Sequence, residues 1–302
     1  MKTFVYKNRC VQDRIFDFLV YFSQWSALII VGYPLIYVIS CSFSDPMAII
    51  TGQVWLFPVK PTIKAYAAIL QDERLIRSFN NSIILVAVGT IMTVTVTVIA
   101  AYPLYRREFV GKRLVMILFT ITMFFSGGMI PSYVVVNSLG MLDTIWALTL
   151  PGALGVWGVI VMRTFFRQNI PEELREATSL DGGSDFSFLF WVVVPLSKAI
   201  IAVMALFYAV GRWNAYFDAM IYLSDSRKYP LPLILRDILI MNQVDLTKIL
   251  QGGEIRDIQR RQSTAELLKY ALIVASSLPV MLLYPFVQKY FVKGVVLGSL
   301  KG

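Results

Sequence analysis

Residues 172–195 read EELREATSLDGGSDFSFLFWVVVP, and this polar segment interrupts a chain that is otherwise mostly apolar. Pro171 and three acidic residues in the next five positions are typical of a helix N-terminus, where carboxylates oppose the positive end of the helix dipole. The polar run at 181–184 predicts a turn, because aspartate, glycine and serine favour turn conformations. The apolar run from Phe186 leads into Pro195 and a hydrophobic span. We therefore predict a short helix outside the membrane, followed by a sharp turn back into the bilayer.

The composition of the whole chain indicates a membrane protein with several spans. Of its 302 residues, 57% are hydrophobic and only 16% are charged, which is less charge than a soluble domain of this size carries. The net charge of +9 comes from basic residues scattered through short connections, as topology signals are, so we expect no nucleic-acid partner. The chain has no histidine, which removes histidine metal ligands and histidine general bases. We therefore expect neither a metal site nor catalytic residues.

Six apolar segments are long enough to cross a bilayer as helices, which takes about 20 residues. Their expected ranges are 16–43, 82–104, 114–136, 144–165, 196–222 and 267–291. Gly127, Gly128 and Pro131 predict a break or a close helix contact in the third span, because glycine and proline interrupt helices. The predicted fold is all-α and polytopic, with six transmembrane helices.

The distribution of basic residues orients these helices. Lysine and arginine gather at the N-terminus, at 105–113, after Arg163 and at the C-terminus, whereas 137–143 contains neither. Because cytoplasmic connections carry an excess of basic residues, both termini and the polar segment are predicted to be cytoplasmic. The expected parts are a cytoplasmic segment at 1–15, a first helix with an extracytoplasmic loop at 16–81, a five-helix core at 82–292 that contains the polar segment 171–195 and an extracytoplasmic loop at 223–266, and a cytoplasmic tail at 293–302.

The polar segment is similar to the EAA loop of binding-protein-dependent ABC importer permeases. In that pattern a Glu-Ala-Ala triplet is followed by a glycine six residues after the glutamate and a proline about thirteen residues later. The chain matches this spacing with Glu176, Ala177, Thr178, Gly182 and Pro195. The resemblance implies the type I importer permease fold and a helix that docks on a separate ATPase subunit. The candidate coupling residues are Glu176, Ala177, Thr178, Leu180, Asp181, Gly182, Phe186 and Pro195; the alternative is an ordinary amphipathic loop.

Three further segments resemble the carbohydrate branch of this family. They are PLSKAIIAVMALF from Pro195, GRWNAYFDA from Gly211 and YPFVQKYFVKGVVLGSLKG from Tyr284. The stretch from Phe124 to Gly152 is similar to a subgroup that imports complex oligosaccharides and polysaccharide fragments. In that subgroup asparagine is expected where this chain has Gly158. The resemblance implies a role as the second, maltose-permease-like permease of a heterodimer.

The family also implies a set of partners and a division of labour. The partners are a second homologous permease, two ATPase subunits, an extracytoplasmic solute-binding protein, a sugar or oligosaccharide substrate, and the lipid bilayer of the bacterial plasma (inner) membrane. The chain has no Walker loop or other nucleotide-binding motif. We therefore expect it to bind no cofactor and to be no enzyme, with ATP and Mg held by the ATPase subunits.

Two further candidate sites follow from the resemblance. A second ATPase contact is expected in the tail at Gly294, Gly298 and Lys301, unless this is simply a frayed terminus. A contact with the binding protein is expected in the second long loop at Gln251, Gly252, Gly253 and Glu254, unless that loop is only solvated.

A candidate sugar pathway lies on the fifth span, because sugar translocation needs aromatic faces and polar groups. Its residues are Tyr208, Arg212, Asn214, Tyr216 and Asp218. Tyr208, Arg212 and Tyr216 have i, i+4, i+8 spacing on this span, with Asn214 and Asp218 nearby. The alternative is that Arg212 reaches the outer headgroups and that Trp213, Phe217 and Tyr222 form an interfacial belt.

Three other functions remain open from the residues alone. A proton- or sodium-coupled carrier usually shows acidic residues within its spans, whereas these spans are nearly free of acids, with Asp218 the main exception. A membrane enzyme needs a metal or nucleophile constellation, and the sequence contains none. An ABC permease for another solute, such as glycerol phosphate or an amino acid, is the alternative within the family.

Overall fold

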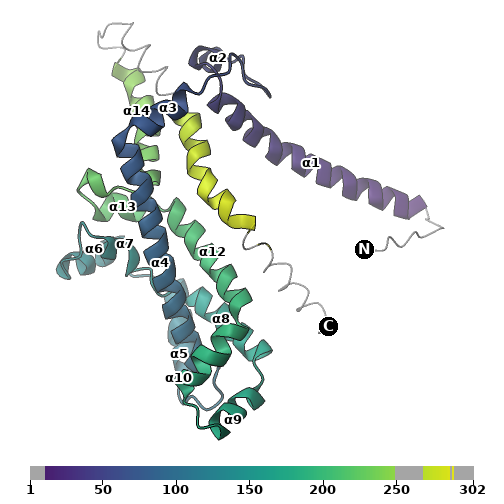
Figure 1. Cartoon of the computed structure of the whole chain (residues 1–302), viewed down its shortest axis with the longest axis vertical. Helices are drawn as coiled ribbons and strands as arrows, with labels where there is room; N and C mark the ends of the chain where they lie inside the picture. The colour runs from purple at the N-terminus through teal and green to yellow at the C-terminus, as the bar shows by residue number, and fades with distance from the viewer. Residues whose placement is uncertain (1–10, 249–267, 286–287, 289–302) are drawn as a thin grey trace. The chain divides into compact units, whose positions relative to one another are not determined.

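Figure 1 shows the computed structural model, which describes residues 11–248, 268–285 and 288. The chain forms two compact units. Of the described residues, the first unit combines 11–71 with 238–248 and 268–275, and the second combines 72–237 with 276–285 and 288. Every regular element in the described ranges is a helix, as the sequence predicts.

The first unit is organised around the C-terminal end of a long helix. Its N-terminal helices are α1 (Val11–Ser42), α2 (Pro46–Ile50) and α3 (Lys64–Gln71). Most of α1 is exposed, and only its last three residues are buried. The Ser40 hydroxyl donates to the Leu56 carbonyl at 2.6 Å, and the Tyr66 hydroxyl donates to the Ser42 hydroxyl at 2.8 Å. These bonds fasten the irregular segment after α2, and α3 itself, to the end of α1.

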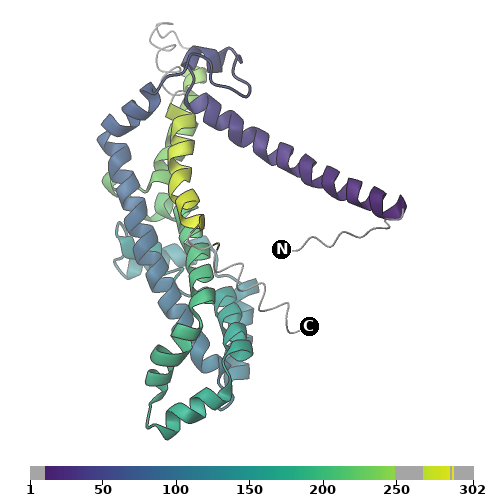
Figure 2. The same cartoon turned by 45° about the vertical axis from the view of Figure 1, so that its right-hand side comes forward.

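The second unit is built on α4 (Glu73–Tyr105), which packs against α8 (Val156–Asn169) and α12 (Lys198–Asn214). Figures 1 and 2 show these three helices side by side. The Asp72 carboxylate caps α4 by accepting from the Arg74 amide at 2.9 Å, so the helix begins nine residues before the predicted span. One face of α4 buries the small residues Ser78, Ser82, Gly89, Thr93 and Thr97. Small residues on this face let large side chains of the neighbouring helices approach closely.

The third and fourth predicted spans are not continuous helices. The third consists of α5 (Lys112–Phe124) and α6 (Met129–Ser138), which meet at 112° beside Gly128 with φ +85°, so the predicted break is confirmed. The fourth, expected as one helix over 144–165, is divided into α7 (Ile145–Thr149) and α8. The connection between them contains Pro151, Gly152 and Gly155. Proline lacks a backbone N–H donor and glycine has a low helix propensity, so α7 does not continue through this connection.

The fifth predicted span also differs from a single helix. The chain runs from α10 (Asp185–Phe188) through a π-helical turn (Leu189–Val193) and α11 (Val194–Leu196), and then bends by 79° into α12. A further short helix, α13 (Phe217–Tyr222), follows. The bend lies beside Pro195, which cannot donate a helical hydrogen bond.

The second long loop, predicted over 223–266, contains a helix in its described part. This is α14 (Leu231–Lys248), preceded by a 3₁₀ turn at Ser226–Lys228. The Leu231 amide donates to the Ser82 hydroxyl at 2.8 Å, and the Asn81 amide donates to the Arg227 carbonyl at 2.8 Å. These two bonds attach the start of α14 to α4, so the segment is an ordered element rather than an irregular loop.

The described helices are those of a multi-pass membrane protein. Three are long and apolar enough to cross a bilayer: α1, α4 and the helix Leu268–Pro285. The two bent pairs, α5 with α6 and the 185–196 segment with α12, pass the same test as pairs and raise the number to five. The bends arise where glycine or proline interrupts an apolar segment.

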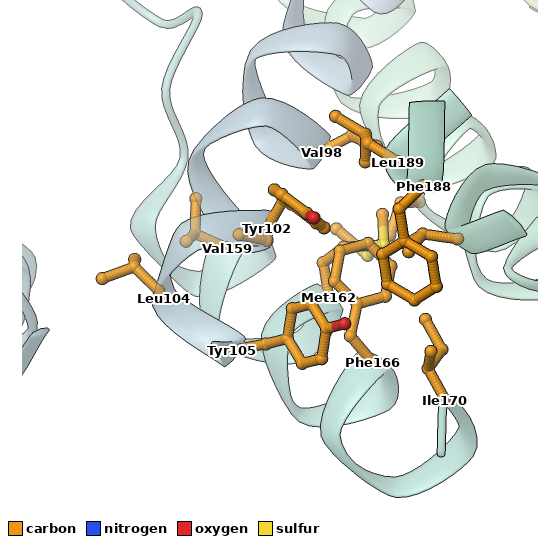
Figure 3. Packing of buried hydrophobic residues seen from close by; sticks show 13 residues of the cluster. Val98, Tyr102, Leu104, Tyr105, Val159, Met162, Phe166, Ile170, Phe188 and Leu189 are labelled. Atoms are coloured by element: carbon orange, nitrogen blue, oxygen red, sulfur yellow. The ribbon is translucent and has the colours of Figure 1, made fainter. Parts of the chain in front are cut away.

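A hydrophobic core joins the ends of α4 and α8 to residues 188–193, which follow the polar loop formed by residues 171–187 (Figure 3). Phe166, Phe188 and Met162 are fully buried at its centre. Tyr105 meets the Phe166 ring edge-on at 5.8 Å, an aromatic contact that contributes about 0.5–1.5 kcal/mol beyond area burial. Ile170, just before the polar helix, belongs to the same core. Both ends of the polar loop are therefore anchored in one packed cluster.

Candidate functional site

The predicted polar helix exists and ends in a well-formed turn. It is α9 (Glu172–Leu180), which follows Pro171. The Gly183 amide donates to the Thr178 carbonyl at 2.8 Å, and the Gly182 amide donates to the Ser179 carbonyl at 3.1 Å. These two bonds are the Schellman pattern, which requires the left-handed backbone that Gly182 adopts at φ +76°. The turn predicted from the Asp-Gly-Gly-Ser run is therefore a helix stop that uses glycine for its positive φ.

Thr178, which stands where the family pattern has a second alanine, is accommodated by the following turn. Its hydroxyl donates to the Leu174 carbonyl at 2.8 Å. A Cβ added to Gly183 would lie 2.6 Å from the Thr178 methyl and 2.9 Å from its carbonyl oxygen. Both the Thr178 methyl and the backbone carbonyl of that residue therefore require glycine at position 183, which explains the second glycine of the turn.

The outward side of this loop exposes apolar and acidic residues together. We call this set the loop face; its residues are Glu176, Ala177, Leu180, Asp181 and Phe186, all exposed. Leu180 is 89% exposed and Phe186 is 75% exposed. Figure 1 shows α9 and α10 at the same end of the second unit. Exposed apolar side chains held on a rigid support mark a surface that contacts another molecule.

Not all predicted coupling residues lie on the loop face. Thr178 is half-buried and packs on the turn, and Gly182 shapes the turn. Pro195 lies in α11, beside the bend into α12. These three residues therefore determine the shape of the loop and do not belong to the loop face.

The structure adds a group of ion pairs that the sequence analysis did not identify. We call it the ionic bridge; it consists of Arg106, Glu108, Arg175 and Asp185. The two carboxylate oxygens of Glu108 accept from different arginines, Arg106 at 2.8 Å and Arg175 at 2.7 Å. Arg106 also pairs with Asp185, and Arg175 also pairs with Glu172 of its own helix. The bridge therefore connects the end of α4 to both α9 and α10.

Burial within the bridge is asymmetric. The side chains of Arg106 and Arg175 are only 12% and 18% exposed, whereas those of Glu108 and Asp185 are 61% and 62% exposed. Partly buried guanidinium groups need such partners, because their fixed donors are shielded from water. One signal was available in the sequence: Glu108 is the single acidic residue in the basic connection 105–113.

The arginines stabilise the charged form of the carboxylates. The hydrogen bond from Arg106, followed by the charge of Arg175, lowers the pKa of Glu108. The hydrogen bond to Glu172 raises the pKa of Arg175. Glu108 and Arg175 are therefore both charged at neutral pH.

We expect the bridge to persist through mildly acidic pH. A carboxylate with a depressed folded-state pKa contributes stability above its unfolded pKa, and that stability is lost as pH falls through the folded value. A spin label at the exposed Ser179 position of α9 should keep constant mobility down to the ordinary carboxyl pKa of about 4 and become mobile only below it. The same label in Glu108→Gln should be mobile at every pH. A transition near neutral pH would contradict this assignment.

Arg212 of the candidate sugar pathway is bound to the backbone of a broken helix. Its guanidinium donates to the Leu148 carbonyl at 3.0 Å, the Thr149 carbonyl at 3.3 Å and the Thr93 hydroxyl at 2.8 Å. Leu148 and Thr149 end α7, where the helix has no further amides to offer its carbonyls. Arg212 therefore caps α7 and ties it to α4, and it does not reach outward as the headgroup alternative required.

Tyr208 explains why this chain has glycine at position 158. Its hydroxyl hydrogen-bonds with the Thr97 hydroxyl at 3.0 Å. A Cβ added to Gly158 would lie 1.8 Å from the Tyr208 hydroxyl oxygen and 2.9 Å from the Met204 methyl carbon. The asparagine expected from the resemblance would not fit, because Tyr208 occupies its space.

The remaining pathway candidates do not join Tyr208 and Arg212 on one face. α12 ends at Asn214, so the i, i+4, i+8 spacing does not place Tyr216 on the same helix as Tyr208 and Arg212. Asn214 bonds locally to the Val210 carbonyl, and Asp218 is exposed on α13. The guanidinium of Arg236 lies over the ring of Tyr216, with its Cζ atom 5.7 Å from the ring centroid.

The proposed interfacial belt is also not formed as expected. Trp213 is buried and its indole donates to the Ser276 carbonyl at 2.8 Å. Tyr222 is buried as well, whereas Phe217 is exposed. Trp213 therefore links α12 to the last described helix instead of facing the headgroups.

Two sets of candidates lie outside the described residues. They are the tail residues Gly294, Gly298 and Lys301, and the loop residues Gln251, Gly252, Gly253 and Glu254.

The chain is similar to known permeases over nearly its full length, although no protein-family model matches it. It is 39% identical over 296 residues to the polygalacturonan/rhamnogalacturonan transport system permease protein YtcP of Bacillus subtilis (strain 168), covering 97% of this chain and 100% of the relative. It is 40% identical over 269 residues to protein LplC of the same organism, covering 89% of each. It is 27% identical over 285 residues to the trehalose/maltose transport system permease protein MalG of Thermococcus litoralis, covering 91% of this chain and 93% of the relative.

A solved structure has the same fold. A chain in the crystal structure of a bacterial ABC transporter involved in the import of the acidic polysaccharide alginate matches with a TM-score of 0.84 and 31% identity. The match covers 94% of this chain and 99% of that chain. The EAA spacing, the helical membrane fold and these full-length similarities agree, and the chain therefore belongs to the permease subunits of carbohydrate ABC importers.

Proposed function

We propose that this chain is one of two homologous permease subunits of a bacterial inner-membrane importer for acidic oligosaccharides. The observation that carries the coupling role is the loop face: Leu180 at the end of α9 and Phe186 in α10 are both exposed, and the hydrophobic core anchors the chain on either side of them. The substrate class is supported by the names of two relatives, which refer to polygalacturonan and to the acidic polysaccharide alginate.

The proposed topology has six spans, with both termini and α9 in the cytoplasm. Its support is the basic character of one end of the second unit. The Arg163 side chain donates to the Leu104 carbonyl at 2.8 Å, and Lys112 donates to the Arg107 carbonyl at 3.1 Å. Arg163 of α8 and Lys112 of α5 are thus bound at the C-terminal end of α4, the end to which the ionic bridge ties α9, as expected for a cytoplasmic surface.

In the proposed mechanism, ATP and Mg bind on two separate ATPase subunits, and one of these holds the loop face. Closure of the ATPase dimer moves α9, and the core beneath it transmits that movement to α4 and α8. The loop face must contact the ATPase differently in the open and closed states, because only differential contact shifts a conformational equilibrium.

Three further parts of the proposal concern delivery and release of the sugar. An extracytoplasmic binding protein delivers the oligosaccharide and contacts the loop at 251–254. The tail at Gly294, Gly298 and Lys301 forms a second contact with the ATPase subunits. Tyr208 and Arg212 stabilise the helices beside the pathway, and Asn214, Tyr216 and Asp218 stay candidates for sugar contact.

The test is uptake by the complete complex in lipid vesicles. Trigalacturonate, presented with the binding protein, should accumulate only when ATP is supplied to the ATPase side, and maltotriose should compete poorly. Leu180→Asp should reduce uptake about 30-fold or more, as expected for a residue central to an interface. Val110→Asp is the matched control, because Val110 is 93% exposed at the same end of the unit but outside the loop face.

Three results would contradict different parts of this proposal. Uptake driven by an ion gradient without ATP would identify an ion-coupled carrier. Equal competition by maltotriose would overturn the acidic substrate class and leave the importer assignment in place. Equal effects of Leu180→Asp and Val110→Asp would overturn the role of the loop face.

A further inference from the structure

The ionic bridge occupies a position that the family resemblance does not account for. Its central residue, Glu108, lies in the connection between α4 and α5, outside the EAA loop. Glu108 and Arg175 are 67 residues apart in the sequence, yet their side chains meet at 2.7 Å. A contact between such distant segments restrains the docking helix relative to the bundle.

Two different supports hold the polar loop. The hydrophobic core anchors its flanks at Ile170 and Phe188, but α9 itself has no buried residue. Along α9, the side chain of Arg175 is the one that reaches another part of the described chain through an ion pair. The angle of α9 relative to α4 therefore depends on Arg175 and on the carboxylate that receives it.

Glu108 receives both arginines at once. Its Oε1 accepts from Arg175 and its Oε2 accepts from Arg106, which follows the last turn of α4 and is itself held by Tyr102 at 3.2 Å and by Asp185. One carboxylate thus joins a guanidinium on the docking helix to a guanidinium on the bundle. Neutral glutamine cannot replace it, because its amide offers a single acceptor oxygen and places a donor group against the second arginine.

We propose that Glu108 is a positioning residue that makes α9 and the cytoplasmic end of α4 move as one body, so that closure of the ATPase subunits is converted into opening of the bundle. This inference rests on the proposed coupling function. Without the bridge, α9 stays attached through its flanks and still docks on the ATPase subunit, but its angle relative to α4 changes when the ATPase subunits close. Part of the movement of the ATPase subunits then only shifts α9 and does not reach the bundle.

The experiment compares Glu108→Gln with Arg107→Gln in the complete complex. Arg107 is the adjacent residue, it is exposed, and its side chain forms no ion pair within the described ranges. Each variant removes one charge from the same connection. The measurement is the number of trigalacturonate molecules imported per ATP hydrolysed, together with the amount of assembled complex and its ATPase rate.

We expect Glu108→Gln to assemble normally and hydrolyse ATP, but to import roughly 2- to 30-fold fewer molecules per ATP, the range for residues that modulate coupling between sites. Arg107→Gln should keep the ratio of the unmodified complex. Arg175→Gln should resemble Glu108→Gln, and the double variant should be no worse than either single variant, because all three remove one bridge. A merely structural role would lower the amount of complex and leave the ratio unchanged.

Several outcomes separate this inference from the proposed function. An unchanged ratio in Glu108→Gln, with uptake still abolished by Leu180→Asp, overturns the role of Glu108 and leaves the docking role of the loop face intact. Additive effects of Glu108→Gln and Arg175→Gln overturn the shared bridge. A complex whose uptake does not depend on ATP overturns the coupling function itself.

Discussion

Gly158→Ala is expected to destabilise the folded permease by about 1–3 kcal/mol, the usual cost of overpacking an interior. The added methyl carbon would lie 1.8 Å from the hydroxyl oxygen of Tyr208 and 3.0 Å from its Cζ atom. The Tyr208 ring cannot retreat easily, because it stands between α8 and α4 and its hydroxyl is bound to Thr97. The effect should appear as a lower unfolding temperature of the purified permease complex in detergent.

Tyr208→Phe should restore most of the stability of Gly158→Ala. This second change removes the oxygen at 1.8 Å. It leaves the Met204 methyl carbon at 2.9 Å and the Tyr208 ring carbon at 3.0 Å, contacts that small shifts relieve. Tyr208→Phe itself removes the hydrogen bond to Thr97. Hydrogen bonds between membrane helices contribute about 0.6 kcal/mol on average, so this loss is small. Gly152→Ala is the control, because a Cβ there meets no atom within 4 Å. If Gly152→Ala were as harmful as Gly158→Ala, the Tyr208 contact would not be the cause.

Gly89→Val is expected to have a larger effect, because it displaces a charge. A Cβ at position 89 would lie 2.5 Å from Nε of Arg212 and 2.6 Å from its Cδ. The displaced guanidinium would lose the Leu148 and Thr149 carbonyls and the Thr93 hydroxyl. Removing the partners of a buried charge costs about 3–5 kcal/mol. We therefore expect little folded complex after solubilisation of membranes that contain this variant.

Arg212→Met should be milder, and it should rescue Gly89→Val. Methionine removes the charge together with the need to pair it, so the remaining loss is the set of hydrogen bonds to α7 and Thr93. The double variant should therefore resemble Arg212→Met alone in unfolding temperature. Uptake per folded complex should also remain close to normal in Arg212→Met, because the arginine supports the helices. Loss of uptake at normal stability would instead restore Arg212 to the sugar pathway.

These two sites show how a chain of broken helices keeps a defined arrangement. α4 is continuous and presents small residues, and α12 inserts Tyr208 and Arg212 against them. The inserted side chains form hydrogen bonds with polar groups of the neighbouring helices, including the carbonyls at the end of α7. In a membrane such groups must be satisfied within the protein. Polar side chains on α12 are therefore used for assembly of the unit.

Local patterns in the sequence predicted local structure correctly. Apolar segments predicted an all-helical membrane chain, and Asp181 with the two following glycines predicted the end of α9. Glycine and proline near position 128 predicted the break between α5 and α6. The expected continuation of the fifth helix past Ala215 was wrong, because helix continuation inside a membrane depends on packing as much as on apolar composition.

By itself the sequence determined the class of the protein: membrane spans of sufficient length, a polar loop with the EAA spacing and the orientation signals of basic residues. Only the tertiary structure decided which side chains work together. Glu108 meets Arg175, Arg212 meets the end of α7, and Tyr208 fills the space beside Gly158. The physical reason is that hydropathy and turn chemistry act over a few neighbouring residues, whereas these contacts join segments about 50 to 70 residues apart and arise only when helices pack.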